Sequence, residues 1–298
     1  MEFRELKTFQ VVANLLSFNN AANILHLAQS TVSAQIRSLE NSLGKELFHR
    51  AGRTISLTPA GVELLNYTQR LVNIEKEILS AMGNLDDKFG NLTIKTPQSI
   101  STYFLPELIK EFQIIFPKIG FDIDWCTSFN LVDIFNSGTL DLAFLITDSF
   151  KEKNLQIEEL AKIKLVLAVH PHDDLLKSKR VTVRDLNNRN LIFVKSDCNY
   201  KNILQKMLIQ SDVNPNKIIE INSLDAVKRL LVLGNGIAFL PEIVIKDELN
   251  KELLKTLDWS GADFGAKLIM IWSKEKHISK PIHAFMMMVK KIIEDYQM

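Results

Sequence analysis

Hydrophobic residues within positions 30–43 recur at steps of three and four, which predicts a helix with one buried stripe. The stripe consists of Val32, Ile36, Leu39 and Leu43. The opposite face has no acid near its N-terminal end and carries Ser30, Ala34, Arg37 and Asn41, flanked by Thr31, Ser33 and Ser38. Short polar groups let a helix backbone approach base edges, and a guanidinium suits guanine or phosphate. The pattern therefore predicts a helix that can contact DNA.

A second amphipathic pattern precedes this helix, with apolar residues at Phe18, Ala21, Ala22 and Leu25. Only residues 26–28 separate the two helices, which is short enough for a helix-turn-helix. A further helix is expected over residues 2–15, with an apolar face on which both can pack. The alternative is a surface helical hairpin without a DNA role, because helical hairpins are common.

Residues 47–57 predict a small β-hairpin with its tip at 49–54. The tip contains a glycine and two arginines, Arg50 and Arg53. Arginines at such a tip suit the DNA backbone or the minor groove. We therefore interpret the hairpin as a wing, the alternative being an exposed hairpin of another kind.

Thr58 and Pro59 predict the start of a long helix, with threonine as the N-cap and proline in the first turn. The next break is at residues 83–84. Two rows of aliphatic residues repeat at intervals of seven: Leu64, Leu71, Ile78 and Leu85, and Leu65, Val72 and Leu79. Such rows favour a partner helix, although the helix could instead pack on its own domain. Polar residues 86–90 form the best candidate for a domain boundary.

From residue 91 the pattern changes to short strands that alternate with helices. The first unit is expected to contain strands at 92–96, 121–125 and 141–146 and helices at 104–116 and 131–135. The second is expected to contain strands at 163–169, 190–194, 217–221 and 236–240 and helices at 199–210 and 224–233. A strand at 267–272 and a helix at 281–296 return to the first unit. This order predicts parallel sheets with helices on their faces, arranged as two α/β lobes.

Composition limits the function classes. The 298 residues carry a net charge of +1, so a DNA-binding surface must be local. Residues 1–60 hold six cations and four acids, a net charge of +2, so affinity should depend on dimerisation and on several phosphate contacts. No apolar run approaches the length of a membrane span, and the N-terminus does not resemble a signal peptide. We expect a cytoplasmic protein without a membrane partner.

Motifs for cofactors, metals or catalysis are not found. The two cysteines, Cys126 and Cys198, are far apart, which excludes a CxxC metal site and a disulfide scaffold. Residues 170–174 contain two histidines and two aspartates, but the proline between the histidines favours a solvated turn. Residues 234–236 lack the third glycine of a dinucleotide fingerprint. We expect no cofactor, no metal and no enzymatic activity.

Residues 15–61, LLSFNNAANILHLAQSTVSAQIRSLENSLGKELFHRAGRTISLTPAG, resemble the winged helix-turn-helix of LysR-type transcriptional regulators. The positions that match that family's pattern are Ser17, Phe18, Ala21, Ala22, Leu25, Gln29, Val32, Ser33, Gln35, Ile36, Leu39, Glu40, Leu43, Gly44, Leu47, Phe48, Arg50, Leu57, Thr58, Ala60 and Gly61. Two departures are Ala28, where the family usually has a serine that caps the helix, and Ala34, where a larger polar residue is common. The first suggests that Ser30 or water caps the helix. Residues 234–241, GNGIAFLP, match a motif of the family's effector-binding half.

The resemblance implies a winged helix-turn-helix DNA-binding domain at residues 1–58, a linker helix and hinge at 59–89, and an effector-binding domain at 90–298. Within the last, lobe I would comprise 90–161 and 266–298, and lobe II 162–265, as in periplasmic binding proteins. The implied partners are double-stranded promoter DNA, a second chain through the linker helix with four chains in all, a small-molecule effector, and RNA polymerase. The expected DNA contacts are Gln29, Ser30, Thr31, Ser33, Gln35, Arg37, Arg50 and Arg53.

The effector is expected in a cleft between the lobes, at the C-terminal ends of strands. The loops there are rich in hydroxyl groups, which suits a small anion or carboxylate. The expected contacts are Ser99, Ile100, Ser101, Thr127, Ser128, Thr147, Cys198 and Asn199. Because these loops contain no arginine, a carboxylate would lack a bidentate clamp or would use Lys195 or Lys201.

The expected function is therefore promoter binding modulated by a small molecule, whose identity the sequence does not give. Four alternatives stay open. The chain could be a constitutive regulator with a closed cleft, or a redox-responsive one that uses Cys198, although no nearby cysteine would resolve its sulfenic acid. A solute-binding protein fits poorly with residues 1–60, and an enzyme with a DNA-binding head lacks a catalytic motif.

Overall fold

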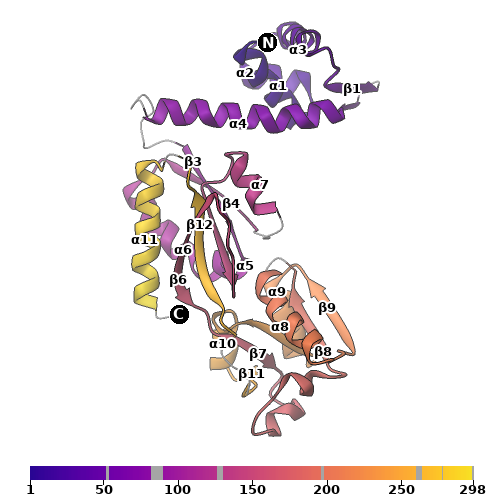
Figure 1. Ribbon diagram of the computed structural model, residues 1–298, viewed down its shortest axis with the longest axis vertical. Helices are drawn as coiled ribbons and strands as arrows, with labels where there is room; N and C mark the ends of the chain where they lie inside the picture. The colour runs from indigo at the N-terminus through magenta and orange to yellow at the C-terminus, as the bar shows by residue number, and fades with distance from the viewer. Residues whose placement is uncertain are drawn as a thin grey trace. The chain divides into compact units, whose positions relative to one another are not determined.

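A computed structural model describes residues 1–51, 54–81, 90–125, 130–195, 198–259, 264–276 and 278–296. The chain divides into two compact units (Figure 1). Met1–Leu85 with the short segment Asn136–Thr139 form the first unit, and Asp86–Phe135 with Leu140–Met298 form the second. Each unit has its own hydrophobic core, so each is described by itself.

The first unit contains the expected helices and hairpin. Its elements are α1 (Phe3–Leu15), α2 (Phe18–Leu25), α3 (Gln29–Leu43), β1 (Phe48–Ala51), β2 (Thr54–Leu57) and α4 (Pro59–Ala81). Helices α1, α2 and α3 pack around one core, which includes Leu6, Phe9, Val12, Ala21, Val32, Ile36 and Leu39. Phe48 at the start of the hairpin fills this core, with its ring centroid 5.5 Å from that of Phe9 and 5.7 Å from that of Phe18. The hairpin is therefore fixed to the helices at its base.

The N-terminal ends of α2 and α4 and the C-terminal end of α3 follow the expected capping chemistry. Ser17 caps α2, because its side chain accepts a hydrogen bond from the Asn20 N–H at 3.2 Å. Thr58 caps α4, accepting from the Gly61 N–H at 3.0 Å, and Gly44 ends α3 with a left-handed φ of 64°. The buried stripe of α3 is shorter than expected, because Leu43 is 38% exposed although Val32, Ile36 and Leu39 are buried. Leu43 lies in the last turn, beyond the helices that cover the other three.

Gly61 allows α4 to pack directly on the chain between α3 and the hairpin. A Cβ at this position would lie 2.2 Å from the Leu47 carbonyl oxygen, which is backbone and cannot rotate away. That same oxygen accepts a hydrogen bond from the Thr58 N–H at 3.0 Å. Replacing Gly61 would therefore strain the junction between hairpin and helix.

We expect Gly61→Ala to lower the free energy of unfolding of the first unit by about 1–3 kcal/mol, in the range of overpacked cores. Thermal unfolding of the full chain should show an earlier transition for this unit and an unchanged one for the second. Val62→Ala is the matched control, because it changes an exposed neighbouring residue of the same helix without adding an atom. An unchanged first transition in Gly61→Ala would contradict the packing described here.

The second unit consists of two lobes, each with a five-stranded sheet. Lobe I has the strand order β4-β3-β5-β12-β6. Its strands are β3 (Gly90–Thr96), β4 (Ile119–Trp125), β5 (Leu142–Thr147), β6 (Leu155–Lys162) and β12 (Lys267–Ser273). Its helices are α5 (Gln98–Tyr103), α6 (Leu105–Ile115), α7 (Leu131–Asn136) and α11 (Lys280–Tyr296). In β5, Leu142 and Phe144 join the core that contains α6 and α11, whereas Ala143 and Leu145 face the core that contains α7. Figure 1 shows α11 and α7 on different sides of this sheet.

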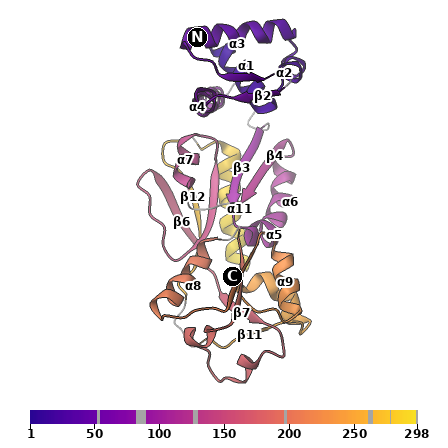
Figure 2. The same ribbon diagram turned by 90° about the vertical axis from the view of Figure 1, so that its right-hand side faces the viewer.

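Lobe II has the strand order β11-β7-β10-β8-β9. Its strands are β7 (Leu165–Val169), β8 (Asn190–Val194), β9 (Lys217–Ile221), β10 (Ile237–Pro241) and β11 (Lys255–Thr256). Its α-helices are α8 (Cys198–Gln210), α9 (Leu224–Val232) and α10 (Lys246–Asn250), and Figure 2 shows α8 and α9 on either side of the lobe. Short 3-10 helices occupy Asp174–Lys177, Val183–Leu186 and Glu242–Ile245. Two crossing segments connect the lobes, and the Ile163 N–H of one donates to the Ala266 carbonyl of the other at 2.9 Å.

The expectation of parallel sheets was wrong in part. β3 pairs in parallel with β4 and β5, but β12 is antiparallel to both β5 and β6. In lobe II, β10 is parallel to β8 and antiparallel to β7. The physical reason is the crossing between lobes: a strand that returns from the other lobe enters the sheet from the opposite end. Strand β6, strand β11 and helix α10 were not anticipated from the sequence.

Candidate functional site

Helix α3 presents the face expected to contact DNA. Ser30, Thr31, Ala34 and Arg37 are exposed, while Val32 and Ile36 are fully buried on the opposite side. The helix begins at Gln29, and Ala28 is its N-cap residue without a side-chain hydrogen bond. The suggestion that Ser30 caps the helix was therefore wrong, because Ser30 already lies inside the first turn. Its hydroxyl stays on the exposed face, where it can approach a base edge.

Two glutamines expected to contact DNA make hydrogen bonds inside the first unit. The Gln29 side-chain amide donates to the Ser33 hydroxyl at 2.9 Å. The side-chain oxygen of Gln35 accepts a hydrogen bond from the buried Thr8 hydroxyl at 2.6 Å, so α1 fixes the orientation of the Gln35 side chain. This contact occupies the Gln35 acceptor and leaves its NH2 group as the donor. Sequence reasoning missed Thr8 because nothing in the local pattern marks a contact between positions 8 and 35.

Further hydrogen bonds hold α3 in place against α1 and the hairpin. Ser38 hydrogen-bonds to Glu5 of α1, and this bond is the main reason that the pKa of Glu5 lies below its usual value. The Glu40 carboxylate accepts from the Leu47 N–H at 2.9 Å, which ties the end of α3 to the start of the wing. These contacts on the sides of the helix leave its outer face available.

The wing is a β-hairpin with a shorter tip than expected. The ladder pairs Phe48 with Leu57, Arg50 with Ile55, and Ala51 with Thr54. Gly52 and Arg53 lie outside the described residues, as does the side chain of Arg50. The contribution of Arg50 and Arg53 to DNA binding therefore stays a prediction.

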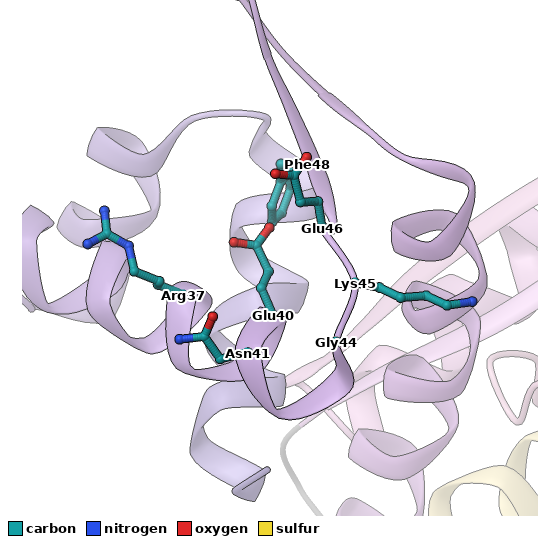
Figure 3. A pocket seen from close by; sticks show the side chains of 7 residues that line it. All are labelled: Arg37, Glu40, Asn41, Gly44, Lys45, Glu46 and Phe48. Atoms are coloured by element: carbon teal, nitrogen blue, oxygen red, sulfur yellow. The ribbon is translucent and has the colours of Figure 1, made fainter.

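A hollow of about 640 Å³ lies between the second half of α3 and the start of β1. It is lined by Arg37, Glu40, Asn41, Gly44, Lys45, Glu46 and Phe48 (Figure 3). In Figure 3, the Arg37 and Lys45 side chains extend to opposite sides of the hollow. Because its two cations point apart and Glu40 and Glu46 also line it, this hollow does not suit an anionic ligand. Phosphate contacts would instead be made by Arg37 and Lys45 along its rims.

Helix α4 combines a packed face with an exposed apolar stripe. Its packed face lies along α1, where Lys7 pairs with Glu75 at 2.6 Å and Gln10 with Gln69 at 2.6 Å. Leu64 and Leu65 pack against the core of the unit. The exposed stripe consists of Tyr67, Leu71, Ile74 and Ile78, which are 55%, 40%, 49% and 56% exposed.

The two expected heptad rows differ only beyond the first turns of α4. Leu64 and Leu65, one from each row, both pack within their own unit. Further along, Val72 is buried, while Leu71 and Ile78 of the other row are exposed. Steps of four, three and four residues place the exposed stripe on one side of α4, as in helices that pair with another helix. Leu85 lies outside the described residues, as does the side chain of Leu79.

In the second unit, α5 lies where lobe I meets lobe II. Ser99 and Ile100 are buried, and the Ser101 hydroxyl donates to the Gln98 carbonyl at 3.0 Å. Two contacts cross to α9. The Gln98 side-chain oxygen accepts from the Leu224 N–H at 3.3 Å, and the Lys228 ammonium donates to the Tyr103 hydroxyl at 3.0 Å. We call these two contacts the α5–α9 clasp.

On another side of the same unit, the loop after β5 faces α8. Thr147 is 8% exposed, and its hydroxyl both donates to the Ser149 carbonyl and accepts from the Ser149 N–H. Asp148 pairs with Lys206 of α8 at 3.5 Å. A hollow of about 350 Å³ lies beside this ion pair. The structure thus places Thr147 at an interlobe hollow.

The remaining expected effector contacts are only partly described. Thr127 and Ser128 lie outside the described residues, together with Cys126. Cys198 and Asn199 begin α8, and their side chains also lie outside. Lys201, which was considered as a carboxylate contact, instead forms an ion pair with Glu220 within lobe II. The strand-end pattern puts Asp148 beside the expected cleft but does not indicate its partner Lys206, although positions 202, 205, 206 and 209 share one face of a helix.

Matches to known families cover both units. Residues 3–62 match the model described as "Bacterial regulatory helix-turn-helix protein, lysR family". Residues 86–292 match the model described as "LysR substrate binding domain". The chain belongs to the LysR family of transcriptional regulators.

Individual LysR-type proteins align with nearly the whole chain. It is 33% identical over 295 residues to "Uncharacterized HTH-type transcriptional regulator YwqM" of Bacillus subtilis (strain 168), covering 98% of this chain and 99% of that protein. It is 31% identical over 291 residues to "Probable RuBisCO transcriptional regulator" of Thalassiosira pseudonana, covering 95% and 94%. Its fold is similar to that of a full-length OxyR variant from Pseudomonas aeruginosa, with a TM-score of 0.74 at 19% identity, covering 99% and 95%.

Membership of the LysR family confirms the winged helix-turn-helix and the two-lobed effector-binding domain inferred from the sequence. The LysR-type chain is a DNA-binding transcriptional regulator, and its second unit is of the family's ligand-binding type. Among the described residues, none of the helices combines the length and apolar character that crossing a membrane requires. The described part of the chain also contains no group of three or more histidine, cysteine or acidic side chains placed to hold a metal ion.

Proposed function

We propose that this LysR-type chain contacts promoter DNA with the exposed face of α3 and with its wing, as a dimer paired through α4. A small molecule bound between the two lobes modulates that binding. The proposed DNA contacts are Gln29, Ser30, Thr31, Ser33, Gln35, Arg37, Arg50 and Arg53. The chain acts as a regulator in the cytoplasm, without a cofactor and without catalysing a reaction.

The exposed face of α3 is the observation that carries this proposal. Val32 and Ile36 bury one side of the helix completely, so Ser30 and Arg37 are held outward by a rigid core rather than by a loop. Rigid presentation matters because base contacts depend on placing donors and acceptors accurately in the major groove. Because few cations lie near α3, a single DNA-binding domain should bind DNA weakly. Pairing of two chains through α4 should supply the rest of the affinity.

Effector control is supported by the contacts between the lobes. A ligand can shift the arrangement of the lobes only if it binds one arrangement more tightly than another. The α5–α9 clasp and the Asp148–Lys206 pair are separate interlobe contacts within the described residues. The Asp148–Lys206 pair joins partly exposed groups, which can exchange partners at a modest cost in free energy.

We expect Arg37→Met to weaken discrimination at one base pair by about 1–3 kcal/mol if the guanidinium contacts a base. Binding would be measured by fluorescence anisotropy against the promoter and against single-base variants at several salt concentrations. Lys164→Met, which removes a half-exposed ion pair with Glu242 in lobe II, is the control for loss of charge. Equal affinities of wild type and Arg37→Met for every sequence, at every salt concentration, would contradict a DNA contact from this face.

Effector binding is tested separately by thermal shift with a broad set of metabolites, followed by promoter-binding assays with each hit. A ligand that binds the native state must raise the unfolding temperature. The proposal requires at least one compound that both stabilises the chain and changes its promoter affinity. If no compound does so, the chain acts as a constitutive regulator.

A further inference from the structure

The interlobe hollow beside α8 is built from both lobes. Lobe I contributes Thr147, Asp148, Ser149 and Phe150, and α8 of lobe II contributes Asn202, Gln205, Lys206 and Ile209. The steps of three, one and three residues put the α8 side chains on one face of that helix. Its volume of about 350 Å³ falls at the small end of the range for ligand sites, which suits a molecule of a few heavy atoms.

The charges in this hollow are balanced and lie on opposite lobes. Asp148 and Lys206 are the charged residues of the lining, and their side chains are 37% and 59% exposed. Their oxygen and nitrogen atoms are 3.5 Å apart, which is long for an ion pair. A partly exposed pair of this kind contributes little to stability, so a ligand can replace it without a large penalty.

The two charges restrict the class of ligand. A monoanion bound to Lys206 would take the cation away from Asp148 and would lie beside an uncompensated carboxylate. A monocation bound to Asp148 would face Lys206 in the same way. A neutral ligand would leave the Asp148–Lys206 pair in place and would gain no charge-assisted hydrogen bond from either residue. A ligand with one ammonium and one carboxylate group compensates both residues.

We infer that this hollow binds a free α-amino acid as the effector, with its carboxylate on Lys206 and its ammonium on Asp148. Asn202 and Gln205 offer amide donors beside Lys206 on the same face of α8. Phe150 is partly buried and Ile209 is 80% exposed, and both offer apolar surface to an aliphatic side chain. The inference rests on the proposed effector function and specifies its ligand.

The bound amino acid would replace a direct contact between the lobes by a bridged one. The Asp148–Lys206 pair would open to admit the ligand, while the α5–α9 clasp would keep its own hydrogen bonds. The lobes would then separate slightly on the α8 side and stay in contact on the α9 side. This difference in lobe arrangement is what a ligand needs in order to shift promoter binding.

The test uses the full-length chain and isothermal titration with the twenty common L-amino acids. It continues with two analogues of leucine: 4-methylpentanoate, which lacks the ammonium group, and 3-methylbutylamine, which lacks the carboxylate. At least one amino acid should bind, and an aliphatic one should bind at least about tenfold more tightly than either analogue, as expected for loss of a charge-assisted contact.

Two variants assign each end of the ligand. In Asp148→Asn the preference for leucine over 4-methylpentanoate should disappear, and in Lys206→Met the preference for leucine over 3-methylbutylamine should disappear. Lys164→Met, which breaks an ion pair elsewhere in lobe II, should keep both preferences. Circular dichroism and thermal unfolding of each variant establish that it is folded.

The outcomes separate this inference from the proposed function. If no amino acid binds, if 4-methylpentanoate binds as tightly as leucine, or if Asp148→Asn keeps the wild-type preference, the amino-acid assignment is wrong. In those cases another metabolite that shifts promoter binding would leave the proposed function standing. If no metabolite of any class binds, the effector part of the proposed function fails as well.

Discussion

Replacing Leu71 and Ile78 together by aspartate should convert the dimer into monomers and lower promoter affinity by at least about 100-fold. Both side chains lie on the exposed stripe of α4, at 40% and 56% exposure, so the fold of a single chain should tolerate the change. Carboxylates on this stripe would have to be desolvated at a helix pair, which is unfavourable. Sedimentation velocity would measure the oligomeric state, and anisotropy titrations the affinity.

The large expected loss of promoter affinity follows from the low net charge of a single DNA-binding domain. With a net charge of +2 in residues 1–60, one head makes few phosphate contacts, so binding two half-sites together supplies most of the affinity. Asn66→Asp combined with Arg70→Gln is the matched control, because it makes the same change in charge on an exposed polar part of α4. A dimer that persists in the Leu71 and Ile78 double variant would show that α4 pairs in another way or not at all.

Replacing Lys228 by methionine should lower the free energy of unfolding of the second unit by roughly 3 kcal/mol. Its ammonium group lies 3.1 Å from the Glu248 carboxylate, and the two side chains are only 17% and 18% exposed. Removing the cation would leave Glu248 almost buried without its counter-charge. The loss would be measured by urea unfolding of the full chain, following the transition of the second unit.

Two further variants separate the parts of this effect. Lys228→Met combined with Glu248→Leu should recover most of the loss, because no uncompensated charge remains. Tyr103→Phe should cost only about 1 kcal/mol, since it removes a single hydrogen bond of the α5–α9 clasp. If the double variant is as unstable as Lys228→Met alone, the buried carboxylate is not the cause.

The effect of Lys228→Met should not depend on pH in the neutral range. Burial lowers the pKa of Lys228, but hydrogen bonds to Tyr103 and Glu248 outweigh burial and raise the pKa well above its usual value. A raised pKa in the folded state means that the stabilisation is complete below the unfolded value of about 10.4 and is lost only as pH rises beyond it. Equal losses at pH 7.5 and pH 9 are therefore expected.

The first unit was largely predictable because its signals are local. Steps of three and four residues marked the buried stripe of α3, and Thr58 with Pro59 marked the start of α4. The failures were local as well. Ser30 was expected as a possible N-cap of α3, but the helix starts at Gln29 with Ala28 as its N-cap residue. Leu43 was expected to be buried, although it lies at the uncovered end of the helix.

The interlobe site was less predictable because its contacts join distant parts of the chain. The ends of the strands indicated that Ser99 and Thr147 would lie near a cleft. Nothing in the sequence indicated that Gln98 would meet the backbone of Leu224, or that Asp148 would meet Lys206. Periodicity shows which face of a helix is buried, but the choice between partner elements depends on how the two lobes close against each other.

Selection of bound sequences from a random pool of double-stranded DNA, using the full-length chain, tests the central claim most directly. A dimer that contacts DNA through α3 should enrich sequences with two half-sites related by a twofold axis and separated by whole helical turns. The half-sites should lose their preference at one position in Arg37→Met. No enrichment over the starting pool, or enrichment that is unchanged in Arg37→Met and in the Leu71 and Ile78 double variant, would contradict the account.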